Sequence, residues 1–186
     1  MKIKSNASPD ELDSPFYEKN QKFCSEFEHF IADKNGKVKG NYNAWSYTIF
    51  GKITQPKNWT LKYKKAIFSS GNLWLSSKFQ SLLVLTEWTT EIPGTFNSDF
   101  LIRKKKKTDS LKILFSTSVS KLTGYDPYII KSRNHESQLI STLIKILDPL
   151  FKSREVYTIE HRHDVLRIEL RTEEHHFDVF NELTKI

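Results

Sequence analysis

Apolar residues recur every three to four positions between residues 15 and 33, which predicts an amphipathic helix. Ser14 followed by Pro15 is typical of a helix start, because serine caps the first turn and proline suits the first helical position. Asn35 and Gly36 tolerate the left-handed conformation that ends many helices. The apolar stripe of this helix consists of Phe16, Phe23, Phe27, Phe30 and Ile31.

Beyond residue 44 the apolar period shortens to two, which is typical of strands with one buried face. Proline- and glycine-containing turns separate the alternating stretches. The pattern therefore predicts an antiparallel meander of about four strands. These strands are expected at residues 45–53, 59–67, 82–92 and 96–105.

The C-terminal part of the chain predicts a β-α-β-β-α unit. Strand patterns occur at residues 111–115 and 128–131, and the apolar face that follows predicts a helix from Asn134 to Asp148. Pro149 disfavours helical geometry at the residue before it, so the helix is expected to end there. The last hairpin is expected at residues 156–160 and 165–171, and a short closing helix at residues 177–183.

These patterns together predict an α+β fold, built on antiparallel sheet with two main helices. The chain of 186 residues is long enough to bury a hydrophobic core without disulfides or metals. We expect a flexible N-terminal segment over residues 1–13 and a single α+β domain over residues 14–186. A split into two subdomains near residues 107–125 is the alternative.

The single cysteine, Cys24, excludes an intrachain disulfide and favours a reducing compartment. The polar N-terminus lacks the apolar run of a signal peptide. No apolar stretch approaches the roughly 20 residues that a membrane-spanning helix needs. We therefore expect a soluble cytoplasmic protein without a transmembrane segment.

The net charge of +7 is unevenly distributed along the chain. Residues 41–131 hold fourteen lysines and arginines against five acidic residues, whereas the two ends are close to neutral. An electrostatic partner is therefore expected to be acidic and to meet the middle of the chain.

Two groups of cations are candidates for that contact. Cations at alternate positions of a strand lie about 6.6–6.8 Å apart, comparable with the phosphate spacing along one nucleic-acid strand. Trp59, Tyr63 and Trp74 add rings on which bases can stack. Alternatively, the second group consists of solvated lysines at the end of an edge strand. The candidates are Lys62, Lys64 and Lys65, and then Arg103, Lys104, Lys105, Lys106 and Lys107.

Four histidines near the C-terminus are the only metal-ligand candidates, and they are weak ones. A zinc site needs three or four converging ligands, and structural sites usually include cysteine, which is missing from this region. We therefore expect turn and surface positions, with no metal and no cofactor. The four histidines are His161, His163, His175 and His176, with Asp164 beside them.

No motif nominates a catalytic residue. Ser116 and Ser118 lack the glycines of a nucleophile elbow, and the chain contains no glycine-rich phosphate loop. The sequence therefore favours a non-enzymatic interaction module whose basic central region meets an acidic protein, a nucleic acid or an anionic membrane surface. Nucleic-acid binding through the basic and aromatic strand face is one alternative. An enzyme or small-ligand protein with a noncontiguous site is the other.

A resemblance to a known family is carried by five segments. They are the helix end at residues 27–32, the strand IFGK, the basic strand FLIRKKKK, the stretch TGYDPYIIKS and the strand DVLRIEL. This layout resembles a widespread group of uncharacterised bacterial domains of unknown function, whose members often follow membrane-spanning segments. The resemblance implies an α+β fold and implies no activity.

Overall fold

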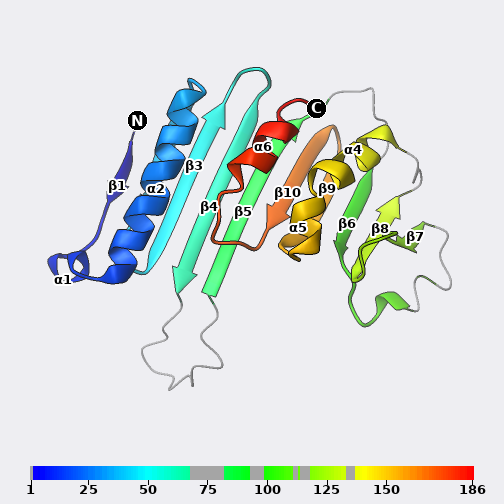
Figure 1. Cartoon of the computed structure of the whole chain (residues 1–186), viewed down its shortest axis with the longest axis horizontal. Helices are drawn as coiled ribbons and strands as arrows, with labels where there is room; N and C mark the ends of the chain where they lie inside the picture. Colours follow the sequence, from blue (N-terminus) through cyan, green and yellow to red (C-terminus); the bar gives the residue numbers. More distant parts are fainter. Residues whose placement is uncertain (1, 68–81, 93–98, 111–112, 114–117, 133–136) are drawn as a thin grey trace. The chain divides into compact units, whose positions relative to one another are not determined.

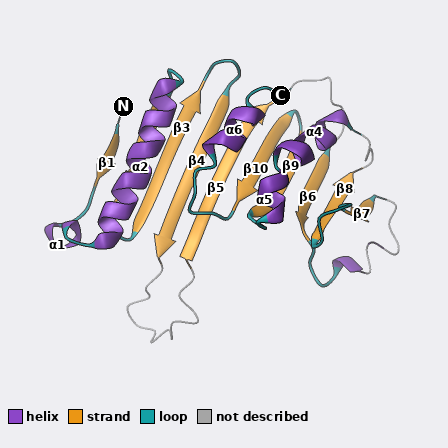
Figure 2. Cartoon of the chain, viewed as in Figure 1, coloured by secondary structure: helices purple, strands orange, loops and turns teal. Residues whose placement is uncertain are grey.

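The computed structural model describes residues 2–67, 82–92, 99–110, 113, 118–132 and 137–186 (Figure 1). Over these residues the chain is mixed α/β, with ten strands that are mostly antiparallel and with five helices. Figure 2 distinguishes the helices from the strands by colour. The chain forms two compact units. The first is Met1–Glu87 with Thr172–His175, and the second is Trp88–Arg171 with His176–Ile186.

The strands of the first unit follow the order β1-β2-β3-β4-β5. The short β1 pairs with β2 in parallel, whereas β2, β3 and β4 pair antiparallel. β5 continues past Glu87, the last residue of the unit's main segment. The bounds are β1 (Ile3–Ser5), β2 (Lys37–Tyr42), β3 (Ser46–Ile53), β4 (Trp59–Ile67) and β5 (Leu82–Glu91).

The helices of the first unit are α1 (Pro9–Leu12) and α2 (Pro15–Asp33). The Ser14 hydroxyl accepts a hydrogen bond from the Phe16 amide at 3.3 Å, which caps α2. α2 lies across one face of the strands and buries its apolar stripe there (Figure 1). The approach is close at Gly51, where an added Cβ would lie 2.7 Å from the end of the Phe27 ring. Glycine in β3 therefore lets the helix pack down on the sheet.

A buried asparagine fixes the start of α2 to the β2–β3 turn. Asn20 is 1% exposed, and its amide nitrogen donates to the carbonyl oxygens of Asn43 and Ala44 at 2.8 and 3.1 Å. The side-chain oxygen of Asn43 in turn accepts from the backbone amides of Trp45 and Ser46. These bonds hold the turn in one geometry, and so they set the pairing of β2 with β3.

In the second unit the strands follow the order β10-β9-β6-β8-β7. Its core includes Ile102, Leu143, Ile159 and Phe180, all of them fully buried. A two-residue turn of residues 163–164, both with positive φ, joins β9 to β10. The bounds are β6 (Phe100–Lys104), β7 (Val119–Lys121), β8 (Tyr128–Ser132), β9 (Val156–Arg162), β10 (Val165–Leu170), α4 (Gln138–Ile146), α5 (Asp148–Lys152) and α6 (Phe177–Leu183).

The predicted combination of helices with mostly antiparallel strands is confirmed, but the predicted counts are wrong. The described residues hold ten strands and five helices, in place of a four-stranded meander, a β-α-β-β-α unit and two main helices. The sequence patterns missed β1, β2 and β7. β1 and β7 have three residues each, too few to show a period, and β2 directly follows the long helix.

The helix predicted from Asn134 to Asp148 is wrong at its end. α4 stops at Ile146, and Pro149 lies in the first turn of the next helix, α5, where its missing amide costs nothing. Asn134, most of the strand predicted at 111–115, and residues 96–98 lie outside the described residues.

The N-terminal segment predicted to be flexible contains β1 and α1. Each of the two units is compact through contacts among its own residues. The predicted single domain over residues 14–186 and the alternative split near residues 107–125 both stay predictions.

Candidate functional site

The first candidate group is divided by the alternation of β4. Lys62 and Lys64 point away from α2 and are partly exposed, whereas Lys65 is 5% exposed on the opposite side. Neighbouring residues of a strand point to opposite faces, so Lys64 and Lys65 cannot contribute to one surface. The structure therefore keeps Lys62 and Lys64 as surface candidates and removes Lys65.

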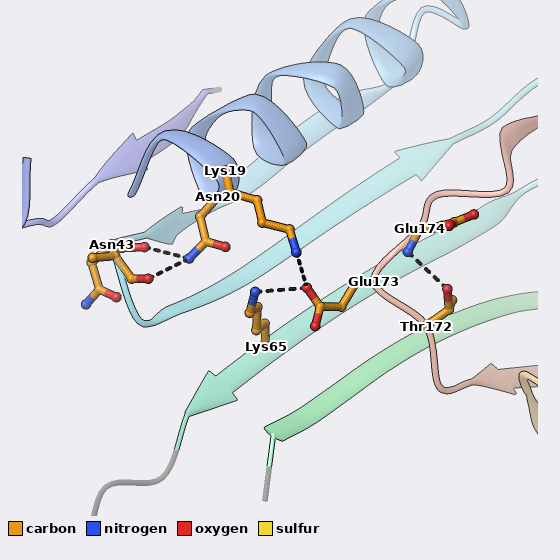
Figure 3. A network of polar contacts seen from close by, with 8 residues as sticks. Lys19, Asn20, Asn43, Lys65, Thr172, Glu173 and Glu174 are labelled. Atoms are coloured by element: carbon orange, nitrogen blue, oxygen red, sulfur yellow. Dashed lines mark hydrogen bonds and ion pairs between the residues drawn. The ribbon is translucent and has the colours of Figure 1, made fainter. Parts of the chain in front are cut away.

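Lys65 belongs to an ion-pair network on the helix side of the sheet (Figure 3). The Glu173 carboxylate lies 3.1 Å from Lys65 Nζ and 2.9 Å from Lys19 Nζ of α2. Burial by itself raises the pKa of Glu173, but the hydrogen bonds from Lys19 and Lys65 outweigh it and hold the pKa below its ordinary value of 4.5. The network ties residues 172–175 to α2 and β4.

The predicted aromatic partners of the lysines are not on the open surface. Trp59 and Tyr63 are each 1% exposed, and Tyr63 packs edge-on against Phe27 of α2 with ring centroids 5.0 Å apart. Trp74 lies outside the described residues. The partly exposed aromatic ring beside Lys62 is Phe50 of β3 instead.

Strand pairing gathers lysines from four strands around Phe50. Lys39, Phe50 and Lys62 lie opposite one another across β2, β3 and β4. The two lysine nitrogens lie over the Phe50 ring, 5.6 and 5.9 Å from its centroid. We name the side of β1–β4 that points away from α2 the lysine face. It carries Lys4, Lys37, Lys39, Phe50, Lys52, Lys62 and Lys64.

Lys4 joins this face through the parallel pairing of β1. It lies beside Asn41, which in turn lies opposite Thr48. The next residue, Ser5, points to the other side, because its hydroxyl accepts a hydrogen bond from Tyr17 of α2 at 3.1 Å. The alternation therefore leaves Lys4 on the face away from the helix.

Over β1–β4 the lysine face has a single sign of charge, and the next acidic residue along the chain is Glu87 of β5. β1, β2, β3 and β4 contain no aspartate or glutamate, and the chain between Asp33 and Glu87 contains none either. Lys37 and Lys52 lie directly opposite each other, an arrangement of like charges that destabilises a sheet. Edge protection does not explain lysines in β3 and β4, because these strands are paired on both sides. Such a face is suited to binding a multiply charged anion.

The second candidate group, residues 103–107, does not extend along a strand. β6 ends at Lys104 and is paired on both sides, with β8 and with β9, so the edge-strand interpretation is wrong. The Arg103 guanidinium binds both carboxylate oxygens of the buried Asp109, at 2.7 and 2.8 Å. This hydrogen-bonded carboxylate raises the pKa of Arg103. Arg103 therefore stabilises the chain after β6.

The lysines that follow take separate positions in the second unit. Lys104 Nζ donates to the Arg154 carbonyl oxygen at 2.7 Å, and the Lys105 amide donates to the Pro127 carbonyl oxygen. Lys106 and Lys107 are exposed in the turn after β6. The two candidate groups lie in different units, and only the group in the first unit belongs to a larger array of cations.

The four histidines lie at separate positions, and the expectation of turn and surface positions is wrong for His161 and His175, which are buried. His161 is buried in β9 and stacks on Phe100, with ring centroids 5.8 Å apart, while His163 is exposed in the turn that follows. His175 stacks on Phe23 of α2 at 3.7 Å. His176, in the second unit, faces Glu155 at 3.2 Å. Among the described residues no three histidine, cysteine or acidic side chains are grouped as metal ligands.

Cys24 is 2% exposed in α2, facing the sheet. Burial, helped by the neighbouring Glu28 carboxylate, raises the pKa of its thiol to about 12. The thiolate form is the nucleophile, so this cysteine is unsuited to nucleophilic chemistry at neutral pH.

Within the described part of the chain, no helix is long and apolar enough to cross a membrane.

Sequence reasoning missed most of the lysine face. Lys4, Lys37 and Lys39 lie in the N-terminal forty residues, whose net charge is zero, and Phe50 was not singled out among the aromatic residues. The alternation of Lys37, Val38 and Lys39 was the signal available, because it already has the period of a strand.

The chain was compared with models of protein families, with curated proteins and with solved structures, and it matches none of them. The resemblance to bacterial domains of unknown function therefore stays a prediction.

Proposed function

We propose that this protein is a non-enzymatic interaction module that binds an acidic partner on its lysine face. The observation that carries the proposal is the collection of six lysines on one side of β1–β4, in strands without a carboxylate. Like charges placed side by side destabilise the folded state. Proteins keep such unfavourable arrangements mainly at functional sites. A polyanion would offset the repulsion on binding.

The proposal is tested by titrating the full chain with inorganic polyphosphate and with poly-L-glutamate in a calorimeter, at several salt concentrations. We expect binding that weakens as salt rises, because the contacts are between exposed charges. The variant Lys37→Gln/Lys64→Gln removes two lysines of the face without touching Phe50. Affinity should fall about 2- to 30-fold, as each exposed ion pair contributes about 0.2–1 kcal/mol.

The matched control is Lys22→Gln/Lys34→Gln, which removes the same charge from α2 and its C-terminal cap. These lysines are in the same unit but belong to the helix that covers the other side of the strands. The control should bind nearly as well as the unmodified protein. Equal loss in both variants, or no salt-dependent binding of either probe, would rule the proposal out.

A further inference from the structure

Resting on that proposed function, we propose that the acidic partner is a single-stranded nucleic acid, with a base stacked on Phe50 and phosphates bound by the flanking lysines of β2 and β4. Phe50 is the aromatic residue of β1–β4 that lies on the lysine face, and it is partly exposed at the centre of the array. An acidic protein would use the lysines but has no need of the ring. The partly exposed Phe50 ring therefore favours a nucleic acid over an acidic protein as the partner.

The lysines form two lines on either side of this ring. Lys37 and Lys39 are alternate residues of β2, and Lys62 and Lys64 are alternate residues of β4. Alternate residues of a strand lie about 6.6–6.8 Å apart, comparable with the spacing of successive phosphates along an extended nucleic-acid strand. Each line therefore matches a phosphate backbone, and a base attached to that backbone can reach the strand between the lines.

The present contacts of Phe50 do not prevent stacking. Lys39 and Lys62 lie over the ring at 5.6 and 5.9 Å from its centroid, and two exposed cation–π contacts together contribute about a 5- to 25-fold preference. Stacking of a base on an aromatic side chain contributes about 5- to 100-fold. A base therefore competes well for the ring, and the displaced ammonium groups remain within reach of the phosphates.

A duplex fits this face less well than a single strand. Four strands at about 4.8 Å spacing span about 14 Å, which exceeds the roughly 12 Å width of the DNA major groove. Paired bases are also already stacked on their neighbours and cannot cover Phe50. Asn41 and Thr48, beside the Phe50 row, add side-chain groups that can hydrogen-bond to sugars or unpaired base edges.

The test measures fluorescence anisotropy of a labelled twelve-residue oligothymidine with the full chain. Phe50→Leu keeps an apolar strand residue but removes the ring, and we expect it to weaken binding about 5- to 100-fold. Phe50→Trp should restore or strengthen binding. Trp45→Leu is the matched control, because Trp45 is an aromatic that is 47% exposed but lies in the β2–β3 turn, outside the lysine face. It should leave affinity unchanged.

Three competitors complete the experiment: a duplex of the same length, poly-L-glutamate, and vesicles that contain phosphatidylserine. The oligothymidine should bind more tightly than each of them at equal charge. If any of them binds as tightly, or if Phe50→Leu has no effect, the nucleic-acid proposal is wrong. The broader proposal then still stands, provided that Lys37→Gln/Lys64→Gln weakens polyanion binding; if no polyanion binds at all, both fail.

Discussion

Lys64 and Lys65 are neighbours in the sequence and have opposite environments. Lys65 is almost completely buried on the side of β4 that faces α2, where it is paired with Glu173. Lys64 lies on the lysine face, and among the described residues no carboxylate pairs with it. The two sides of the same strands therefore treat charge differently. The helix side neutralises its one buried cation, whereas the other side accumulates cations.

This difference separates a charge that holds the fold together from charges that are available to a partner. A buried cation must be paired, because desolvation without a counter-charge is costly. Exposed and partly exposed cations keep their hydration, so six of them can share one face at modest cost. The total charge of a segment does not distinguish these cases. The position of each residue within the strand period does.

We expect the largest loss of stability from a substitution on the side of the strands that faces α2. Phe27 is fully buried, contacts Tyr63 edge-on and lies over Gly51. Phe27→Ala should lower the free energy of unfolding by about 3–5 kcal/mol, because it removes a large buried ring and leaves a cavity. Phe50→Ala, on the lysine face, should cost less than half as much. Urea unfolding followed by tryptophan fluorescence measures both, and equal losses would contradict the contrast between the faces.

The next prediction compares the stability of variants at the neighbouring Lys65 and Lys64. Lys65→Met should lower the free energy of unfolding by about 1–3 kcal/mol, since it leaves the partly buried Glu173 with Lys19 alone. Lys64→Met should change it by less than about 0.5 kcal/mol. In binding experiments the order should reverse, with Lys64→Met the weaker polyanion binder. A stable Lys65→Met protein would show that the network is not required.

The third prediction concerns the pH dependence of the same network. The pKa of Glu173 is lower in the folded protein than its ordinary value of 4.5, so the ionised form stabilises the fold. That contribution is fully present above pH 4.5 and is lost as the pH falls through the lowered value. Glu173→Gln should therefore be less stable than the unmodified protein at pH 7, and the difference should shrink on acidification. A difference that stays constant from pH 7 to strongly acidic solution would assign no role to the charge of Glu173.

The smallest effect tests the lysine face for repulsion. Lys37 and Lys52 lie opposite each other in β2 and β3. Lys52→Gln should therefore raise the free energy of unfolding by about 0.2–1 kcal/mol at low salt. The gain should disappear at high salt, where exposed charges are screened. Lys22→Gln, which loses a weak pair with Glu26 in α2, should bring no gain. Thermal unfolding at two salt concentrations measures the change.

The sequence predicted the elements whose periods are long enough to recognise. The helix over Pro15–Asp33 and the hairpin of β9 and β10 were found because apolar residues recur over many positions with clear ends. β1 and β7 were missed because three residues carry no period. β2 was missed although its residues alternate, because it directly follows Asn35 and Gly36, which were interpreted only as the end of the helix.

The sequence did not separate exposed lysines from buried ones, and the reason is physical. The contact residues named from the sequence stay predictions, but their environments differ: Lys62 and Lys64 are partly exposed, whereas their sequence neighbour Lys65 is buried. Residues 103–107 are five consecutive cations, but consecutive residues of a strand point to opposite faces and cannot form one charged surface. Pairing between strands, which brings Lys39 beside Phe50 and Lys62, depends on register, and a single sequence does not reveal register.

β1 has a second consequence besides supplying Lys4. It occupies the outer hydrogen-bonding edge of β2, a six-residue strand that would otherwise offer its amides and carbonyls to a strand from another molecule. The edge that β1 itself presents is only three residues long and carries a lysine, two features that discourage intermolecular strand addition. A short, charged outer strand therefore makes strand addition unfavourable at this edge of the sheet.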